Sequence, residues 1–333
     1  MTATETEVRA AEAWFVAHGL PWFVDDIRAH VHAGLRRRRL LSVLLVGLVL
    51  GAVAGTALVW LADRSSVDAG AGVVLGSQVV LVVLATYALT TLRAGSIARW
   101  AGKRTLGSLG LLFPLVTRAL PLLLLFITFL FINAEVWQVS ATLDGAVMWL
   151  TVLLFSAIGI AFLLVRIPEE MEIFDRELDP TRVAAGARGT PLEEAAAAYA
   201  ESDAAQRVLQ ERIGGLQKVN LILVLLIAQA VQVLLLSLSV FGFFLVFGVL
   251  AMQPDVVASW VGHQPEAVFG KGARLSRELV QVSVFLAAFS GLYFTVYAVT
   301  DELYRKQFFT TIVRELERAV SARAAYRMMK RAH

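Results

Sequence analysis

The chain of 333 residues contains no cysteine, and only 17% of its residues are charged. The missing cysteine excludes disulfides, thiolate metal sites, cysteine nucleophiles and lipid attachment to cysteine. Soluble domains carry about 25% charged residues, and 58% of this chain is hydrophobic. Because long uncharged stretches alternate with charged ones, the composition is typical of a multi-pass membrane protein.

Motifs of well-known catalysts and channels are also missing. The sequence has no Walker A loop, GxGxxG, GxSxG, potassium-channel filter or arginine-repeat voltage sensor, and no histidine stands at zinc-site spacing. Catalysis needs convergent acid, base, nucleophile or metal groups, so we expect no enzymatic activity, no cofactor and no metal. The net charge of +3 reflects basic residues beside apolar runs, so we also expect no nucleic-acid partner.

Six apolar runs are long enough to cross a bilayer, which takes about 20 helical residues. They cover residues 41–62, 69–92, 119–138, 145–165, a stretch within 219–252, and 279–300. The sequence therefore predicts an all-α bundle of about six transmembrane helices with cytoplasmic amphipathic helices, in which residues 40–165 hold spans one to four and residues 219–303 hold spans five and six.

Basic residues predict the orientation, because they concentrate in cytoplasmic connections. They lie at residues 36–39, in the connection 93–118 and in the tail 304–333, whereas the connections 63–68 and 135–144 have almost none. Both termini are therefore predicted to be cytoplasmic, in the inner membrane of a bacterium, with the loop 253–278 outside and a short helix after Pro254.

Three cytoplasmic parts are expected. Residues 1–39 read as two short helices broken at Gly19–Pro21, with aromatic residues suited to the membrane interface (Trp14, Phe15, Trp22 and Phe23). Residues 166–218 form an insert with an acidic start and a helix opened by Thr190, Pro191 and Glu193 as a capping box; a break is expected at Gly214–Gly215. This insert is a docking surface for a cytoplasmic protein partner or simply a solvated loop, and residues 304–333 form a basic helix.

The fifth run is too long for one plain crossing. Its roughly 34 residues would span about 51 Å as a helix, whereas a 40° tilt across the hydrocarbon uses only about 39 Å. We expect this run either to project beyond the bilayer or to break near Gly242 or Gly248.

Gly47, Gly51 and Gly55 repeat at every fourth residue of the first span. Glycines at this spacing line one helix face and let another backbone approach closely. They predict helix packing, either against a neighbouring span of the same chain or in a homo-oligomer.

Polar residues concentrate in spans three, five and six, where they are costly if unpaired. The set that would line a polar route consists of Arg118, Asn133, Glu135, Gln229, Gln232, Ser290 and Tyr297. The alternative is structural: the serines and glutamines bond between helices, Arg118 reaches the inner surface and Glu135 lies at the outer mouth.

The stretch from Arg118-Ala-Leu-Pro121 to Asn133-Ala-Glu135-Val-Trp137-Gln138 resembles integral membrane proteins of actinobacteria that carry no assigned activity. The resemblance implies a bacterial inner membrane and no mechanism. The leading functional hypothesis is a channel or transporter for a small solute or ion. The alternatives are a membrane scaffold that docks partners on its cytoplasmic helices and a membrane enzyme acting on lipid; in every case the bilayer is a partner.

Overall fold

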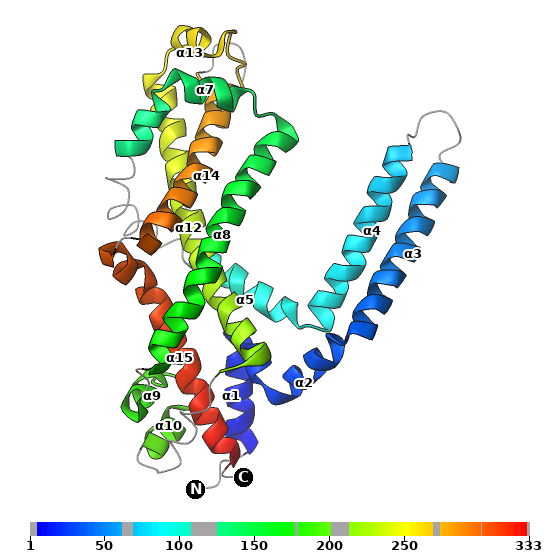
Figure 1. Cartoon of the computed structure of the whole chain (residues 1–333), viewed down its shortest axis with the longest axis vertical. Helices are drawn as coiled ribbons and strands as arrows, with labels where there is room; N and C mark the ends of the chain where they lie inside the picture. Colours follow the sequence, from blue (N-terminus) through cyan, green and yellow to red (C-terminus); the bar gives the residue numbers. More distant parts are fainter. Residues whose placement is uncertain are drawn as a thin grey trace. The chain divides into compact units, whose positions relative to one another are not determined.

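The computed structural model describes residues 5–61, 69–107, 125–176, 179–200, 213–268, 274–300 and 302–331, and almost all of them are helical (Figure 1). In these ranges the single extended pairing is an isolated bridge between Ala267 and Ser276. The predicted all-α fold class is confirmed.

Four described helices are long and apolar enough to cross a membrane: α3 (Arg37–Leu61), α8 (Gly145–Arg176), α12 (Gly215–Ala251) and α14 (Arg277–Thr300). A fifth crossing is added if α4 (Ala69–Thr90) and α5 (Ala94–Gly107), which meet at a bend of 87°, are taken as one broken span. The chain is a multi-pass membrane protein by these helices. Residues 119–124 of the predicted third span, and Arg118 before them, lie outside the described residues.

The outer end of the third span differs from the prediction. Residues 125–131 are helical, but the helix ends there and α7 (Ala134–Ala141) begins anew. Asn133 is extended and its side chain accepts a hydrogen bond from the backbone N–H of Glu135 at 2.8 Å, as an N-cap does. The prediction of one helix through Gln138 is therefore wrong, because the asparagine caps a separate helix.

The fifth apolar run is one unbroken helix of 37 residues. The expected break near Gly242 or Gly248 is wrong. The alternative, a helix that projects beyond the bilayer, stays a prediction. Neither glycine has a positive φ, and glycine within an apolar helix costs only about 1 kcal/mol. The predicted break at Gly214–Gly215 is present, since Gly215 has φ +55° and opens α12.

The chain forms two compact units, and the first contains residues 1–102, 179–224 and 317–333. Its N-terminal part is α1 (Glu5–Ala17), the 3₁₀ turn η1 (Pro21–Phe23) and α2 (Asp25–Gly34), broken as predicted around Gly19, which has φ +76°. Phe15, Trp22 and Phe23 are buried in this unit. The expectation that they lie in the membrane interface is wrong, because they pack into a protein core.

The last helix, α15 (Glu302–Arg331), supplies the centre of that core. From Ala319 to Met329 nearly every described side chain is buried, including Arg323 and Tyr326. Arg323 donates from Nε to Oε1 of Gln217 at 3.0 Å, and the Tyr326 hydroxyl donates to Glu12 at 2.6 Å. Burial, with the Glu12 contact, raises the pKa of Tyr326. The sequence predicts a basic helix for this tail. Much of that helix is instead buried in the core of the first unit.

Asn220, near the start of α12, fixes the N-terminal turn. Its amide nitrogen donates to the carbonyl of Gly19 at 2.9 Å, and its oxygen accepts from the backbone N–H of Trp22 at 3.0 Å. Asn220 is fully buried. It therefore satisfies two backbone groups that a broken helix would leave unpaired.

The predicted cytoplasmic insert 166–218 starts as a helix, because α8 continues to Arg176. It then contains α9 (Pro180–Gly186), capped by Asp179, and α10 (Glu193–Ala200). Thr190 accepts from Leu192 N–H at 3.2 Å, and Glu193 reaches back to Gly189 N–H at 2.8 Å. The predicted capping box thus forms, with the glutamate contact shifted by one residue.

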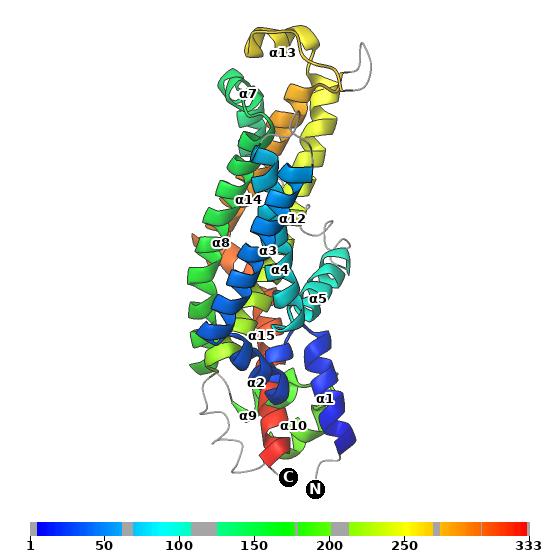
Figure 2. The same cartoon turned by 90° about the vertical axis from the view of Figure 1, so that its right-hand side faces the viewer.

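The second unit contains residues 103–178 and 225–316. At one end of it, α7 and α13 (Pro254–Val261) lie beside the start of α14 (Figures 1 and 2); α13 begins at Pro254 as predicted. Trp137 of α7 packs against Trp260 and Phe131, and Phe131 stacks on Phe244 with ring centroids 4.7 Å apart. This aromatic cluster closes one end of a bundle formed by α8, α12 and α14.

Candidate functional site

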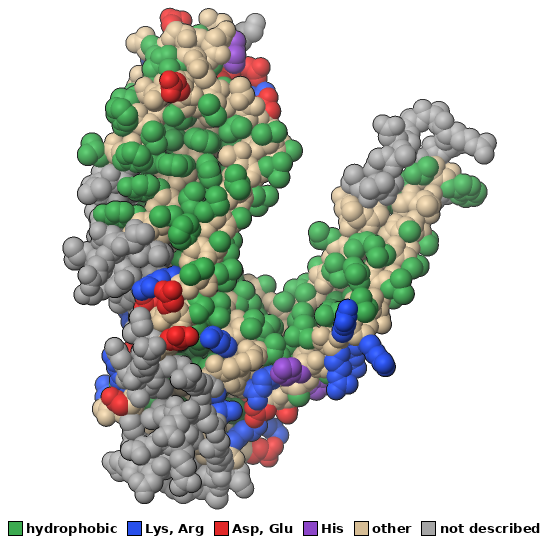
Figure 3. Space-filling model, viewed as in Figure 1, with side chains coloured by type: hydrophobic (Ala, Val, Ile, Leu, Met, Phe, Trp, Pro, Cys, Tyr) green, Lys and Arg blue, Asp and Glu red, His purple; other side chains and the backbone are tan. Residues whose placement is uncertain are grey.

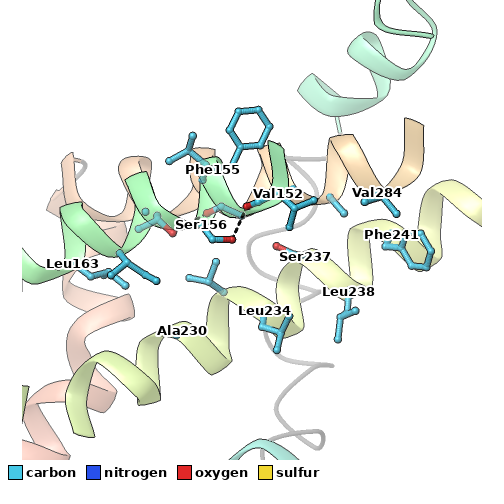
Figure 4. A pocket seen from close by; sticks show the side chains of 18 of the residues that line it. Val152, Phe155, Ser156, Leu163, Ala230, Leu234, Ser237, Leu238, Phe241 and Val284 are labelled. Atoms are coloured by element: carbon cyan, nitrogen blue, oxygen red, sulfur yellow. Dashed lines mark hydrogen bonds between the residues drawn. The ribbon is translucent and has the colours of Figure 1, made fainter. Parts of the chain in front are cut away.

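A cavity of about 390 Å³ lies among the three long helices of the second unit (Figure 4). Each helix presents one face to it, with residues recurring at three- and four-residue intervals as a helical stripe does. The face of α8 runs from Trp149 to Leu163, that of α12 from Ala230 to Phe241, and that of α14 from Val284 to Thr295.

Small residues create the space between the helices. Gly159, Ala230, Ala288 and Gly291 all line the cavity. A Cβ atom added at Gly291 would collide with the Ser237 hydroxyl, so α12 and α14 approach closely there. At Gly159 an added Cβ would lie 3.8 Å from Thr295, which is ordinary contact.

The lining is almost entirely apolar. Its hydroxyl groups include those of Ser156 and Thr295, which donate to the carbonyls of Val152 and Gly291 on their own helices at 2.8 and 2.7 Å. This backward bonding, four residues along a helix, satisfies a hydroxyl without a ligand. Figure 4 shows Ser156 directed at its own helix while Leu163, Leu234 and Leu238 surround the space. Such a site does not hold ordered water, which needs two to four polar partners.

The cavity is elongated along the helices. Eleven residues separate Ala230 from Phe241 on α12 and Val284 from Thr295 on α14, which corresponds to about 16 Å at 1.5 Å per residue. Leu234 and Leu238 are 49% and 52% exposed, so the cavity has an open rim. The three helices that form the cavity are long and apolar enough to cross a membrane.

The residues predicted to line a polar route do not gather at this cavity. Asn133 caps α7, and Glu135 in its first turn is exposed. Gln229 is fully buried in α12 and Gln232 is half-buried, but the cavity lining described above includes neither. Arg118 lies outside the described residues.

Two residues of the predicted polar route, Ser290 and Tyr297, lie on α14. The Ser290 hydroxyl donates to the carbonyl of Leu286 on its own helix. Tyr297 stacks on Tyr293 with centroids 6.0 Å apart, and Tyr293 in turn stacks on Phe126. The described contacts therefore account for Ser290 and Tyr297 as helix packing.

The glycine stripe of α3 faces α4. A Cβ atom added at Gly51 would lie 2.6 Å from the carbonyl oxygen of Gly76, so the two backbones touch. At Gly47 the nearest atom would be 3.6 Å away, on Val83, and Gly55 is also buried. This contact lies within one chain, which is the first of the two alternatives for the stripe.

A polar cluster at the α7 end of the second unit was not expected from the sequence. Asp144, before α8, accepts from Arg277 at 2.6 Å and from the Gln281 amide at 2.8 Å. Glu278, only 3% exposed, accepts from the backbone N–H of Glu266 at 3.2 Å. The sequence shows these residues as scattered loop charges, and only the fold brings them together.

Among the described residues, no group of three or more histidine, aspartate or glutamate side chains is placed to hold a metal ion. Comparisons of the chain with protein-family models, curated proteins and solved structures find no match.

Proposed function

We propose that this membrane protein binds a single hydrophobic chain, such as the acyl chain of a membrane lipid, in the cavity among α8, α12 and α14. One observation carries the proposal: an apolar cavity about 16 Å long, with an exposed rim, lies among three helices that are long and apolar enough to cross a membrane. Such a rim is expected to face hydrocarbon. Its volume of about 390 Å³ falls within the roughly 300–1,000 Å³ of small-molecule sites. Apolar cavities of this kind bind apolar molecules in place of water.

The proposal is one of binding. The side chains that line the cavity include no ionisable group, so we assign it no reaction. Transport of a small solute or ion stays a prediction. Flux through the reconstituted protein, compared with its Glu135→Gln and Gln232→Leu variants, tests it. A homo-oligomer and a protein partner at residues 166–218 also stay predictions.

A photoreactive fatty acid that carries a diazirine and an alkyne tests the acyl-chain proposal. The purified protein in lipid nanodiscs is loaded with the probe and irradiated, and the labelled peptides are mapped by mass spectrometry. We expect labels on the stripes 149–163, 230–241 and 284–295. Ala230→Trp fills the cavity, so the probe loses the space that it would occupy, and we expect labelling there to fall at least about tenfold, which corresponds to about 1.4 kcal/mol of binding.

The matched control is Ala161→Trp. Ala161 is exposed on α8, a membrane helix, and is not part of the lining, so the same bulk is added to a lipid-facing surface. Labelling should stay at the level of the unsubstituted protein. Equal labelling of Ala230→Trp and the unsubstituted protein, or labels spread evenly over all lipid-facing helices, would show ordinary lipid contact and contradict the proposal.

We also propose the finer location: a bacterial inner membrane with both termini in the cytoplasm. The basic residues flanking α3 and α4 and the actinobacterial resemblance support it. Since the chain has no cysteine, single-cysteine variants report topology cleanly. Ser259→Cys on α13 should react with a membrane-impermeant maleimide on intact spheroplasts, and Ala17→Cys on α1 should react only after lysis. The reverse pattern would contradict the orientation.

A further inference from the structure

Four consecutive arginines lie at the start of α3. Arg36 precedes the helix, Arg37 to Arg39 open it, and each is exposed. Within the described residues their side chains form no ion pair. Two other arginines of the first unit do form ion pairs, Arg28 with Asp25 and Arg9 with Glu5. The four-arginine segment is therefore an uncompensated positive surface.

More positive charge lies at the same end of the α3–α4 hairpin. The Tyr87 hydroxyl on α4 donates to the carbonyl of Gly34 at 2.7 Å, and a Cβ added at Gly34 would press on Thr91. These contacts hold the end of α4 beside the start of α3. Arg93 follows in the turn to α5, with φ +56°, and its side chain is exposed.

Helix α5 extends this surface sideways. The angle between α4 and α5 is 87°. On α5, Ile97 is buried and Trp100 packs against Gly19. Arg99, on the same helix, is exposed. We call Arg36–Arg39, Arg93 and Arg99 the hairpin basic patch.

The patch borders hydrocarbon. Leu40, Leu41, Leu44 and Leu45 come directly after Arg39 and are exposed, as expected for side chains that face lipid. Figure 3 shows Lys and Arg side chains gathered around the start of α3, beside the hydrophobic side chains of the hairpin. The arginines therefore lie at the depth of lipid headgroups.

The two carboxylates of α2 do not pair with these arginines. Asp25 on α2 is engaged by Arg28 and Lys330, and exposed Asp26 lies ten residues before Arg36. The first turn of a helix repels cations, because the helix dipole is positive there. An anion at the start of α3 would be attracted by both the dipole and the arginines.

We propose that the hairpin basic patch binds the phosphate headgroups of anionic phospholipids in the adjoining leaflet. Arginine binds phosphate with two parallel N–H···O bonds, and clusters of four or more basic residues beside a membrane helix are attracted to anionic lipid. This site differs from the apolar cavity, so either proposal can fail alone.

Native mass spectrometry of the full chain, released from nanodiscs of mixed phosphatidylglycerol and phosphatidylcholine, tests the proposal. Each arginine near an anionic surface contributes about fivefold in binding. We expect phosphatidylglycerol to be enriched on the unsubstituted protein. Changing Arg36, Arg37, Arg38 and Arg39 together to glutamine should lower that enrichment at least about tenfold.

The same four positions changed to lysine are the charge-matched control and should keep most of the enrichment. A second variant, Arg93→Gln with Arg99→Gln, leaves α3 untouched and should show a smaller loss. On the unsubstituted protein the enrichment should weaken as ionic strength rises, a measurement that needs no variant.

Three results would overturn the proposal: equal enrichment on the glutamine variants, no dependence on salt, or displacement of the lipid by free inorganic phosphate at constant ionic strength. The last result would indicate a site for a soluble phosphate.

Discussion

Buried polar side chains bond differently in the two units. In the first unit they join separate elements: Asn220 of α12 holds the turn at Gly19, and Arg323 of α15 bonds to Gln217. In the membrane spans of the second unit, Ser290 and Thr295 bond back to their own helix. Near the start of α14 a side chain does join two elements, since Gln281 donates to Asp144.

The difference follows from the solvent around each region. A core built from short, broken helices leaves backbone groups unpaired at each break, and buried side chains must satisfy them. A long membrane helix already satisfies its backbone. Neighbouring membrane helices then associate through complementary surfaces, and small residues let them approach closely.

The largest expected effect is at Asn220. Asn220→Leu leaves the N–H of Trp22 and the carbonyl of Gly19 without their partner, so we expect the free energy of unfolding to fall by about 2–4 kcal/mol. Thermal unfolding and hydrogen exchange at residues 19–24 measure it. Gln232→Leu, on the same helix but in the membrane span, is the control and should cost under about 1 kcal/mol. Equal costs would abolish the contrast between the two regions.

The glycines of α3 test whether close approach of the α3 and α4 backbones holds the hairpin together. Gly51→Ala forces α3 and α4 apart, because its Cβ would lie 2.6 Å from the Gly76 oxygen, and we expect a cost of about 1–3 kcal/mol. Gly47→Ala meets only ordinary contact and should change stability by under about 0.5 kcal/mol. Unfolding in mixed micelles of rising SDS content measures both. If the two variants behave alike, close approach at Gly51 does not hold the hairpin.

A smaller effect depends on pH. Burial raises the pKa of Asp25, but its hydrogen bonds with Lys330 and Arg28 lower this pKa by more. The net result is a pKa below the ordinary 3.8. A depressed pKa stabilises the fold above that ordinary value, and the contribution is lost as pH falls through the lowered pKa. Asp25→Asn should cost at most about 1 kcal/mol at neutral pH, since the pair is partly exposed.

The check is the difference in melting temperature between Asp25→Asn and the unsubstituted protein, followed from neutral pH to below pH 3.8. This difference should shrink as pH falls. A constant difference would mean that the carboxylate charge contributes nothing.

The smallest effect is expected in the middle of α14. Among the described residues, the Ser290 hydroxyl bonds to its own helix, so Ser290→Ala should cost less than about 0.6 kcal/mol. SDS unfolding measures this as well. A loss above about 1 kcal/mol would show that Ser290 joins α14 to another helix, as polar residues do in the first unit.

Local signals predicted the helix boundaries well. Pro254 starts α13, Gly215 starts α12, and the Gly19–Pro21 break separates α1 from α2. Each signal acts through its own backbone: proline fixes φ, and glycine accepts a positive φ. Asn133 carried the same kind of signal as an N-cap, but within an apolar run it was taken for the end of a span.

Such local signals could not predict the long-range contacts. Nothing near Arg323 in the sequence indicates Gln217, and the aromatic residues of 14–23 look equally suited to a membrane surface or a core. The apolar cavity was missed for a related reason: its lining residues, such as Ala230 and Gly291, resemble ordinary packing residues until three helices are brought together.

The contact between Gly51 and Gly76 also bears on how the chain enters the membrane during synthesis. Helices α3 and α4 come early in the sequence, and the N-terminal parts of a chain emerge first. Two helices whose backbones touch leave no room for a lipid chain between them. We therefore expect them to partition from the translocon as one hairpin, assembled before α8, α12 and α14 have been made.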